Sequence, residues 1–145
     1  MLSNKDNKFI NLAASEAHNS PCLMRHGCIA VKNGKIIGRG YNNYRSSSKD
    51  GFINNCMTCH AEIAAIREVH KRNYNFKKVV LYVVRLDANN DLQESGPCVD
   101  CMEQIQKLNI KRVVHSTYGG KVEKIKPVNY VSKHVTNGKK VLIQM

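Results

Sequence analysis

The sequence predicts an α/β fold in which helices cover both faces of a mixed β-sheet. Two patterns support this prediction: a hairpin signal at Asn33-Gly34, and an alternation of helix and strand patterns in the second half of the chain. Asn-Gly favours a type I′ turn because both central positions need a positive φ. Strands joined through a helix run parallel, so we expect parallel last strands beside an antiparallel hairpin.

The expected elements follow from the spacing of apolar residues. A period near 3.6 residues predicts helices, and short β-branched runs bounded by turn residues predict strands. Helices are expected at residues 4–17, 61–72 and 98–108, and strands at 28–31, 35–41, 78–84 and 112–116. Polar segments predict loops at 42–55 and 86–96, and weaker patterns indicate short strands at 122–125 and 141–143 and a helix at 128–134.

Length and composition favour a single domain spanning residues 1–145. Of the 145 residues, 42% are hydrophobic and 23% are charged, which is typical of a globular chain that buries a core. The longest apolar run, Val79–Val84, has six residues, whereas a membrane span needs about twenty. The N-terminus lacks the apolar stretch of a secretory signal. We therefore expect a cytoplasmic protein with no membrane partner.

The chain is strongly basic. Its net charge is +12 at pH 7, and such a surplus favours anionic partners such as nucleotides and nucleic acids. A basic surface that serves only solubility is the alternative interpretation.

Two short motifs contain residue types that bind metals. His60 lies in Cys-His-Ala-Glu, and Cys98 and Cys101 lie in Pro-Cys-Val-Asp-Cys. Both motifs are expected at helix starts, where the positive end of the helix favours thiolates. One imidazole and two thiolates suit Zn²⁺ and leave a fourth position for water, as in catalytic zinc sites. A structural zinc site or inert thiols are the alternatives.

Glu62 lies two residues after His60 and is better placed beside a zinc-bound water than as a fourth ligand. Zinc lowers the pKa of its bound water to about 7, and a nearby carboxylate can take the proton and hand it on. This chemistry suits the addition of hydroxide to an amidine-like carbon and the loss of ammonia. The order H-x-E and then P-C-x-x-C is the pattern of zinc-dependent nucleobase deaminases.

The sequence resembles the cytidine and deoxycytidylate deaminase superfamily from the first helix to about Ser116. The matching stretches are residues 26–31, 36–42, 59–62 and 97–101. The resemblance implies a three-layer α/β/α fold with a mixed five-stranded sheet. It also implies the following site residues: zinc on His60, Cys98 and Cys101, and Glu62 as the proton shuttle.

The same resemblance implies the substrate contacts. Asn42 would hold the sugar or the base, and the backbone at Ala61 and around Pro97 would read the base. An Asx turn that closes the strand is the alternative for Asn42. Arg45, followed by three serines, and His26 are candidate donors to a substrate phosphate, with a solvated loop as the alternative for Arg45.

Within the superfamily the sequence looks most similar to deoxycytidylate deaminases. Cys59 before His-Ala-Glu, the stretch 40–42 and the strand at 110–114 favour that branch, whose H-A-E-x-N-A pattern is broken here by Ala64. Residues 60–66 are also similar to purine-base and tRNA adenosine deaminases. The expected substrate is a cytosine nucleotide or nucleoside; a purine, adenosine in tRNA, and a non-catalytic zinc module that binds nucleic acid are the alternatives.

Two further expectations concern metal and assembly. Cys22, His26, Cys56 and Cys59 are candidates for a second, structural zinc site, with buried free thiols as the alternative. Relatives in the superfamily generally assemble, so the resemblance implies a homo-oligomer.

Overall fold

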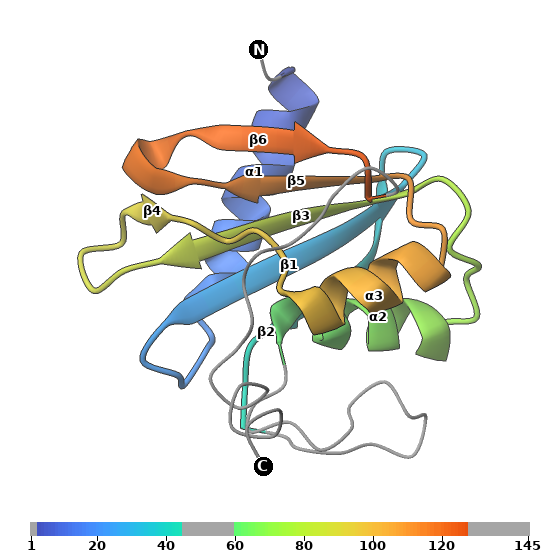
Figure 1. Ribbon diagram of the computed structural model, residues 1–145, viewed down its shortest axis with the longest axis horizontal. Helices are drawn as coiled ribbons and strands as arrows, with labels where there is room; N and C mark the ends of the chain where they lie inside the picture. The colour runs from blue at the N-terminus through green and yellow to red at the C-terminus, as the bar shows by residue number, and fades with distance from the viewer. Residues whose placement is uncertain (1–2, 45–59, 128–145) are drawn as a thin grey trace.

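The computed structural model describes residues 3–44 and 60–127 (Figure 1). In chain order its elements are α1 (Asn4–Ala17), β1 (Arg25–Lys32), β2 (Lys35–Tyr41), α2 (Ala61–Lys71), β3 (Val79–Leu86), β4 (Leu92–Gln93), α3 (Val99–Lys107), β5 (Arg112–Ser116), the short 3-10 helix η1 (Tyr118–Gly120) and β6 (Val122–Ile125). The elements expected at 128–134 and 141–143 lie outside the described residues. Within these ranges, no helix is both long and apolar enough to cross a bilayer.

The sheet contains strands of both directions. In the described residues it has six strands in the order β2-β1-β3-β5-β6, with β4 paired to β3 outside this path. Here β3 and β5 are parallel, and the other pairs are antiparallel. The expected α/β class with a mixed sheet is confirmed. The strand count differs from five because Leu92 and Gln93, in a segment expected to be a loop, pair with β3.

Helices cover both faces of this sheet, with α1 on one face and α2 and α3 on the other (Figure 1). Alternate side chains of β3 serve the two faces: Leu81 and Val83 pack with α2 and α3, whereas Tyr82 and Val84 pack with α1. Each fully buried Val or Leu contributes about 1.5–3 kcal/mol relative to exposure. Burial on both faces explains why this strand is apolar at nearly every position.

The β1–β2 hairpin turns at Asn33 and Gly34, as predicted. The φ angle is 52° at Asn33 and 78° at Gly34, which is the pattern of a type I′ turn. This tight connection fixes the register of the two strands that follow the first helix.

β2 contains one extra residue. Ala30 pairs with Gly38 while Val31 pairs with Ile36, so the register shifts between these pairs. The result is a β-bulge at Ile37, and Ile37 and Gly38 are both buried although they are consecutive.

Two glycines of β2 allow α2 to approach the sheet closely. A Cβ at Gly38 would lie 2.7 Å from the Ala65 carbonyl oxygen, and a Cβ at Gly40 would lie 2.5 Å from the Ala65 nitrogen. Glycine is therefore required here for steric reasons. This close approach places the first turn of α2 beside the end of β2.

Asp6 anchors α1 to the sheet. It forms a capping box with Ser3, its Oδ1 accepts a hydrogen bond from the Tyr82 hydroxyl at 2.6 Å, and its Oδ2 lies 2.8 Å from the Lys124 Nζ. Burial raises the pKa of Asp6, but the bonds from Lys124, Tyr82 and Ser3 together outweigh burial and lower that pKa from 3.8 to about 2.

Candidate metal centre

The three expected metal ligands come together at the starts of α2 and α3. His60 is the N-cap residue of α2, and Cys98 is the N-cap residue of α3. The His60 Nδ1 lies 3.1 Å from the Cys101 Sγ and 3.5 Å from the Cys98 Sγ. All three ligand atoms lie within 4.8 Å of one another, and no second group of three such side chains is found in the described residues.

This arrangement fits a tetrahedral zinc ion. With Zn–S near 2.3 Å and Zn–N near 2.0–2.1 Å, tetrahedral ligand atoms lie about 3.5–3.8 Å apart. Two thiolates and an imidazole are donors that zinc prefers, and two helix N-termini at the same place favour thiolates. The three side chains therefore form a zinc site that leaves one position for a non-protein ligand.

The ionisable groups of the centre perturb one another. The hydrogen bond from the Cys101 thiol lowers the pKa of Cys98 to about 4, with help from His60 and against the effect of burial. The bond with Cys98 and burial raise the pKa of Cys101 well above its usual range. Burial lowers the pKa of His60, but Cys98 and Glu62 outweigh burial and raise it to about 9. A bound cation displaces such protons from its ligands.

Glu62 is buried next to the ligands, in the first turn of α2, and is only 3% exposed. Burial raises the pKa of Glu62, although the His60 charge and hydrogen bonds from the Cys101 thiol and its own backbone oppose this effect. A buried carboxylate with a raised pKa is suited to take up a proton and return it.

A buried hydrogen-bond network holds the segment that leads to Cys98. The Ser95 N–H donates to the Ser116 carbonyl oxygen at 2.9 Å, and the Ser95 hydroxyl donates to the Val83 carbonyl oxygen at 2.9 Å. The Ser116 hydroxyl donates to the Gln93 carbonyl oxygen at 2.6 Å. Sequence reasoning missed these positioning residues because the two serines are 21 residues apart and share no local pattern.

The Asn42 side chain ties the end of β2 to the start of β1. Its Oδ1 accepts from the His26 backbone N–H at 2.8 Å, and its Nδ2 donates to the Met24 carbonyl oxygen at 2.7 Å. These bonds reach 16 and 18 residues back along the chain, unlike those of an Asx turn. They use one of the two amide N–H groups and one oxygen lone pair.

The remaining expected substrate contacts are partly described. Ala61 is 0% exposed and Pro97 is under 2% exposed, and each adjoins a metal ligand in the chain. His26 is half-buried in β1, opposite Arg85 of β3. Arg45 lies outside the described residues.

The expected second zinc site stays a prediction. Cys56 and Cys59 lie outside the described residues. The cysteines that the structure does describe are Cys22, Cys28, Cys98 and Cys101, and all four are free thiols.

A comparison with known protein families gives a match over the segment that contains both metal-binding motifs. A family model for the cytidine and deoxycytidylate deaminase zinc-binding region matches residues 3–117. This range includes the three metal ligands, Glu62 and all elements from α1 to β5.

Individual relatives have different substrates in their names. The chain is 26% identical over 129 residues to the deoxycytidylate deaminase of Schizosaccharomyces pombe, an alignment that covers 77% of this chain and 37% of that protein. It is 31% identical over 113 residues to the tRNA-specific adenosine deaminase of Streptococcus pyogenes serotype M1, covering 77% of this chain and 54% of that protein. The chain thus spans about half or less of these two relatives.

A solved structure shares the fold. The dCMP deaminase of the cyanophage S-TIM5 superimposes with a TM-score of 0.62 at 23% sequence identity, covering 99% of this chain and 94% of that chain.

Proposed function

The chain belongs to the cytidine and deoxycytidylate deaminase family, and we propose that it is a zinc-dependent hydrolytic deaminase. Its proposed substrate is a cytosine nucleotide or nucleoside, deoxycytidylate in particular, which is converted to the uracil product with release of ammonia. The observation that carries this proposal is a buried Glu62 beside three side chains with zinc-ligand spacing. A purely structural zinc site needs no buried carboxylate.

Each protein residue has a role in the proposed reaction. His60, Cys98 and Cys101 would hold the zinc ion, which supplies a Lewis acid that makes hydroxide available at neutral pH. Glu62 takes a proton from the attacking water as the oxygen bonds to C4 of the cytosine ring, and it protonates N3. Glu62 then takes the remaining proton from the C4 hydroxyl and delivers it to the amino group at C4, so that the C4 oxygen becomes a carbonyl as the C4–N bond breaks and ammonia leaves.

The surrounding backbone and side chains would orient the substrate. The proposed contacts to the base are the backbone groups of Ala61 and Pro97, which lie next to the ligands in the chain. Asn42 would bind the sugar or base through the amide capacity that its two backbone bonds leave unused. His26 and Arg45 are the proposed donors to a substrate phosphate.

Adenosine in tRNA is the second candidate substrate. The tRNA-specific relative is more identical to this chain than the deoxycytidylate deaminase is, at 31% against 26%, and Ala64 departs from the deoxycytidylate pattern. The net charge of +12 is also compatible with a polyanionic substrate.

A substrate panel tests the proposal. Purified, zinc-loaded protein is incubated with deoxycytidylate, deoxycytidine, adenosine, guanine or tRNA, and ammonia release is measured. We expect release from the cytosine substrates and most from deoxycytidylate. Release from tRNA alone would favour the second candidate, and zinc binding without release from any substrate would support a non-catalytic module.

We also propose that the protein assembles into a homo-oligomer. Leu23, Met24 and Tyr118 are 96%, 53% and 68% exposed, and exposed large apolar side chains favour association. Light scattering coupled to size-exclusion chromatography should give a mass at least twice the 16.4 kDa of one chain. A monomeric mass would contradict this.

A further inference from the structure

Five neighbouring strands carry a lysine at the same edge of the sheet. In the strand order β2-β1-β3-β5-β6, these residues are Lys35, Lys32, Lys78, Lys111 and Lys126. Each is the terminal residue of its strand at this edge or lies within one residue of it. We call these five residues the lysine row.

The strand register places members of the row side by side. Lys32 is paired with Lys35 across the hairpin and with Val79 of β3, the residue after Lys78. The Lys111 N–H donates to the Val79 carbonyl oxygen at 2.9 Å. With neighbouring strands about 4.8 Å apart, the four gaps of the row span about 19 Å.

The row lies at the edge of the sheet opposite the metal centre. β2 starts at Lys35 and ends beside Ala61, whose carbonyl oxygen lies 2.7 Å from where a Cβ of Gly40 would be. The seven residues of this strand extend about 20 Å. Anything bound along the row is therefore remote from Glu62.

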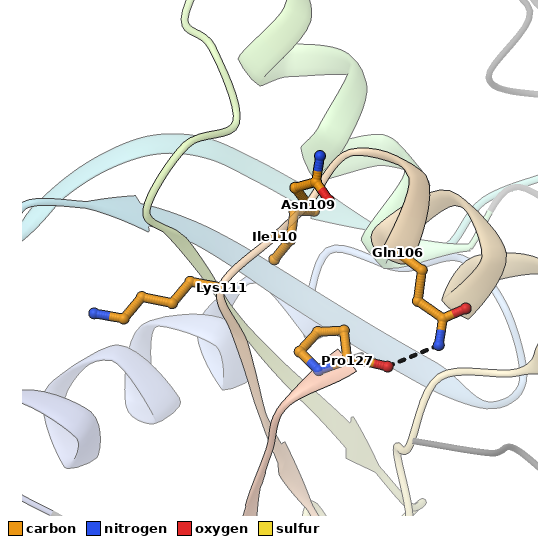
Figure 2. Close-up of a pocket in the computed structure, with 5 residues that line it drawn as sticks. All are labelled: Gln106, Asn109, Ile110, Lys111 and Pro127. Carbon is orange, nitrogen blue, oxygen red and sulfur yellow. Dashed lines mark hydrogen bonds between the residues drawn. The ribbon is translucent and has the colours of Figure 1, made fainter. Parts of the chain in front are cut away.

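The lysine side chains are accessible and partly held in place. Four of the five lysines are exposed, and Lys32 is half-buried. The Lys35 Nζ donates to the Tyr74 hydroxyl at 3.2 Å, and the Lys32 Nζ donates to the Asn75 carbonyl oxygen at 3.3 Å. Lys111, Gln106 and Pro127 all line a cavity of about 510 Å³. The Gln106 side chain donates to the Pro127 carbonyl oxygen at 2.7 Å, and the Lys111 side chain extends away from both residues (Figure 2).

Acidic residues are concentrated at one edge of the sheet. The acids Asp87, Asp91, Glu94 and Asp100 follow the end of β3 or begin α3, at the edge that carries the metal centre. Near the row, Glu68 is paired with Arg72 at 3.8 Å, and Asp6 is paired with Lys124. Arg25, Arg85 and Lys121 also lie at the edge with the acids, so a polyanion meets cations at both edges but fewer repelling carboxylates at the lysine row.

The backbone at Lys78 adds an independent observation. Its φ angle is 63°, a left-handed conformation, and every other non-glycine residue with positive φ in the described residues is an asparagine. Lysine is less suited to this conformation than asparagine. Such strain is concentrated at functional positions, so the charge at Lys78 is the feature to test.

We infer that the lysine row is a docking surface for the phosphate backbone of nucleic acid. A line of cations follows an anionic polymer and reads no sequence. A membrane is a poorer match because the exposed large apolar residues of the described chain lie at the opposite edge: Leu23, Met24, Tyr44 and Tyr118. This inference is independent of the proposed deaminase substrate.

Fluorescence anisotropy with labelled 20-mer RNA and DNA of the same sequence tests the inference. Five phosphate contacts predict a slope of log affinity against log salt of about −3.5 for a single strand. The double variant Lys78→Asn with Lys111→Gln should reduce the slope to about −2 and weaken binding at least about tenfold at low salt. RNA and DNA should bind within a few-fold of each other because only the backbone is contacted.

A matched control distinguishes the effect of the lysine row on affinity from the effect of net charge. Lys8→Gln with Lys121→Gln removes the same two charges from exposed positions outside the row and should change affinity less than about threefold. Lys78→Asn alone should raise the melting temperature by a few degrees, since it relieves the left-handed lysine. This result would show that weaker binding does not come from misfolding.

Three results would overturn the inference. They are a control variant that loses as much affinity as the row variant, a wild-type protein that does not bind either 20-mer at 50 mM salt, and binding through the row to anionic vesicles in preference to nucleic acid. Ammonia release from free nucleotides should be equal in all these variants, so failure of the inference is distinguishable from failure of the proposed function.

Discussion

Two carboxylates are buried on opposite faces of the sheet, and their surroundings act on them in opposite directions. On the α1 face, bonds from Lys124, Tyr82 and Ser3 outweigh burial and lower the pKa of Asp6 to about 2. On the α2 face, burial dominates and raises the pKa of Glu62.

The difference distinguishes a structural carboxylate from a reactive one. Burial alone does not decide the role, since Asp6 and Glu62 are only 8% and 3% exposed. Where donors outweigh burial, as at Asp6, the charged form is fixed in place, whereas a carboxylate at which burial outweighs the donors, as at Glu62, is able to bind and release a proton. We therefore expect changes at Glu62 to affect turnover and changes at Asp6 to affect stability.

The largest expected effect is on turnover in Glu62→Gln. The amide cannot accept or return a proton, so kcat should fall by roughly 10³-fold or more, while zinc content and melting temperature stay close to wild type. Glu68→Gln on the same helix, at a 42% exposed side chain, is the matched control and should keep full activity. Normal turnover in Glu62→Gln would show that Glu62 does not carry a proton in the reaction.

Cys98→Ser should weaken zinc binding by more than roughly 100-fold, because a ligand is lost from a three-residue set. Zinc per chain, measured by atomic absorption after dialysis, should fall while the α1 face stays folded. Cys22→Ser separately tests the second zinc site, because zinc per chain falls in that variant only if Cys22 binds a second ion. Unchanged zinc content in Cys98→Ser would refute the ligand assignment.

Asp6→Ala should lower the free energy of unfolding by about 2–4 kcal/mol, because it removes the carboxylate that completes the capping box with Ser3 and leaves the Tyr82 hydroxyl without its acceptor. Urea unfolding measures this change. Lys8→Ala, at an exposed position of the same helix, should change stability by less than about 0.5 kcal/mol. A fall in the kcat of folded Asp6→Ala protein would argue against a purely structural role.

The smallest expected effect is on the pH dependence of stability. Because folding lowers the pKa of Asp6 from 3.8 to about 2, its stabilisation is complete above pH 4 and is lost as the pH falls towards 2. We expect this contribution to be about 1–2 kcal/mol, since Lys124 is partly exposed and screened. Asp6→Asn should lose less stability than wild type in that window, measured by thermal unfolding at each pH; equal losses would contradict the assignment.

Much of the fold was predictable because its signals are local. The bounds of α1, β2 and β5 agree with the expected ranges, since apolar spacing and the Asn33-Gly34 turn act over a few residues. β4 was not predictable, because the pairing of Leu92 with Leu86 in a polar segment depends on tertiary contact.

The metal centre was predictable for a related reason. Two motifs at helix starts needed only the correct topology to meet, and the structure brings their three ligand side chains together. The Ser95–Ser116 bonds and the two backbone bonds of Asn42 join residues far apart in the chain, so no local pattern indicates them. The pKa of a carboxylate is equally non-local, because it depends on donors from other elements.

The bulge at Ile37 gives the hairpin a tolerance to changes in length. In an ordinary strand the loss of one residue reverses the facing of every side chain beyond it. Removing Ile37 instead restores regular alternation and leaves Gly38 and Gly40 facing α2 and Asn42 on its present side, although it also removes a buried core side chain. Deleting a residue between Gly38 and Tyr41 would turn the residues beyond the deletion to the opposite face of the sheet. Ile37 is therefore the position at which β2 can lose a residue while Asn42 keeps its present side.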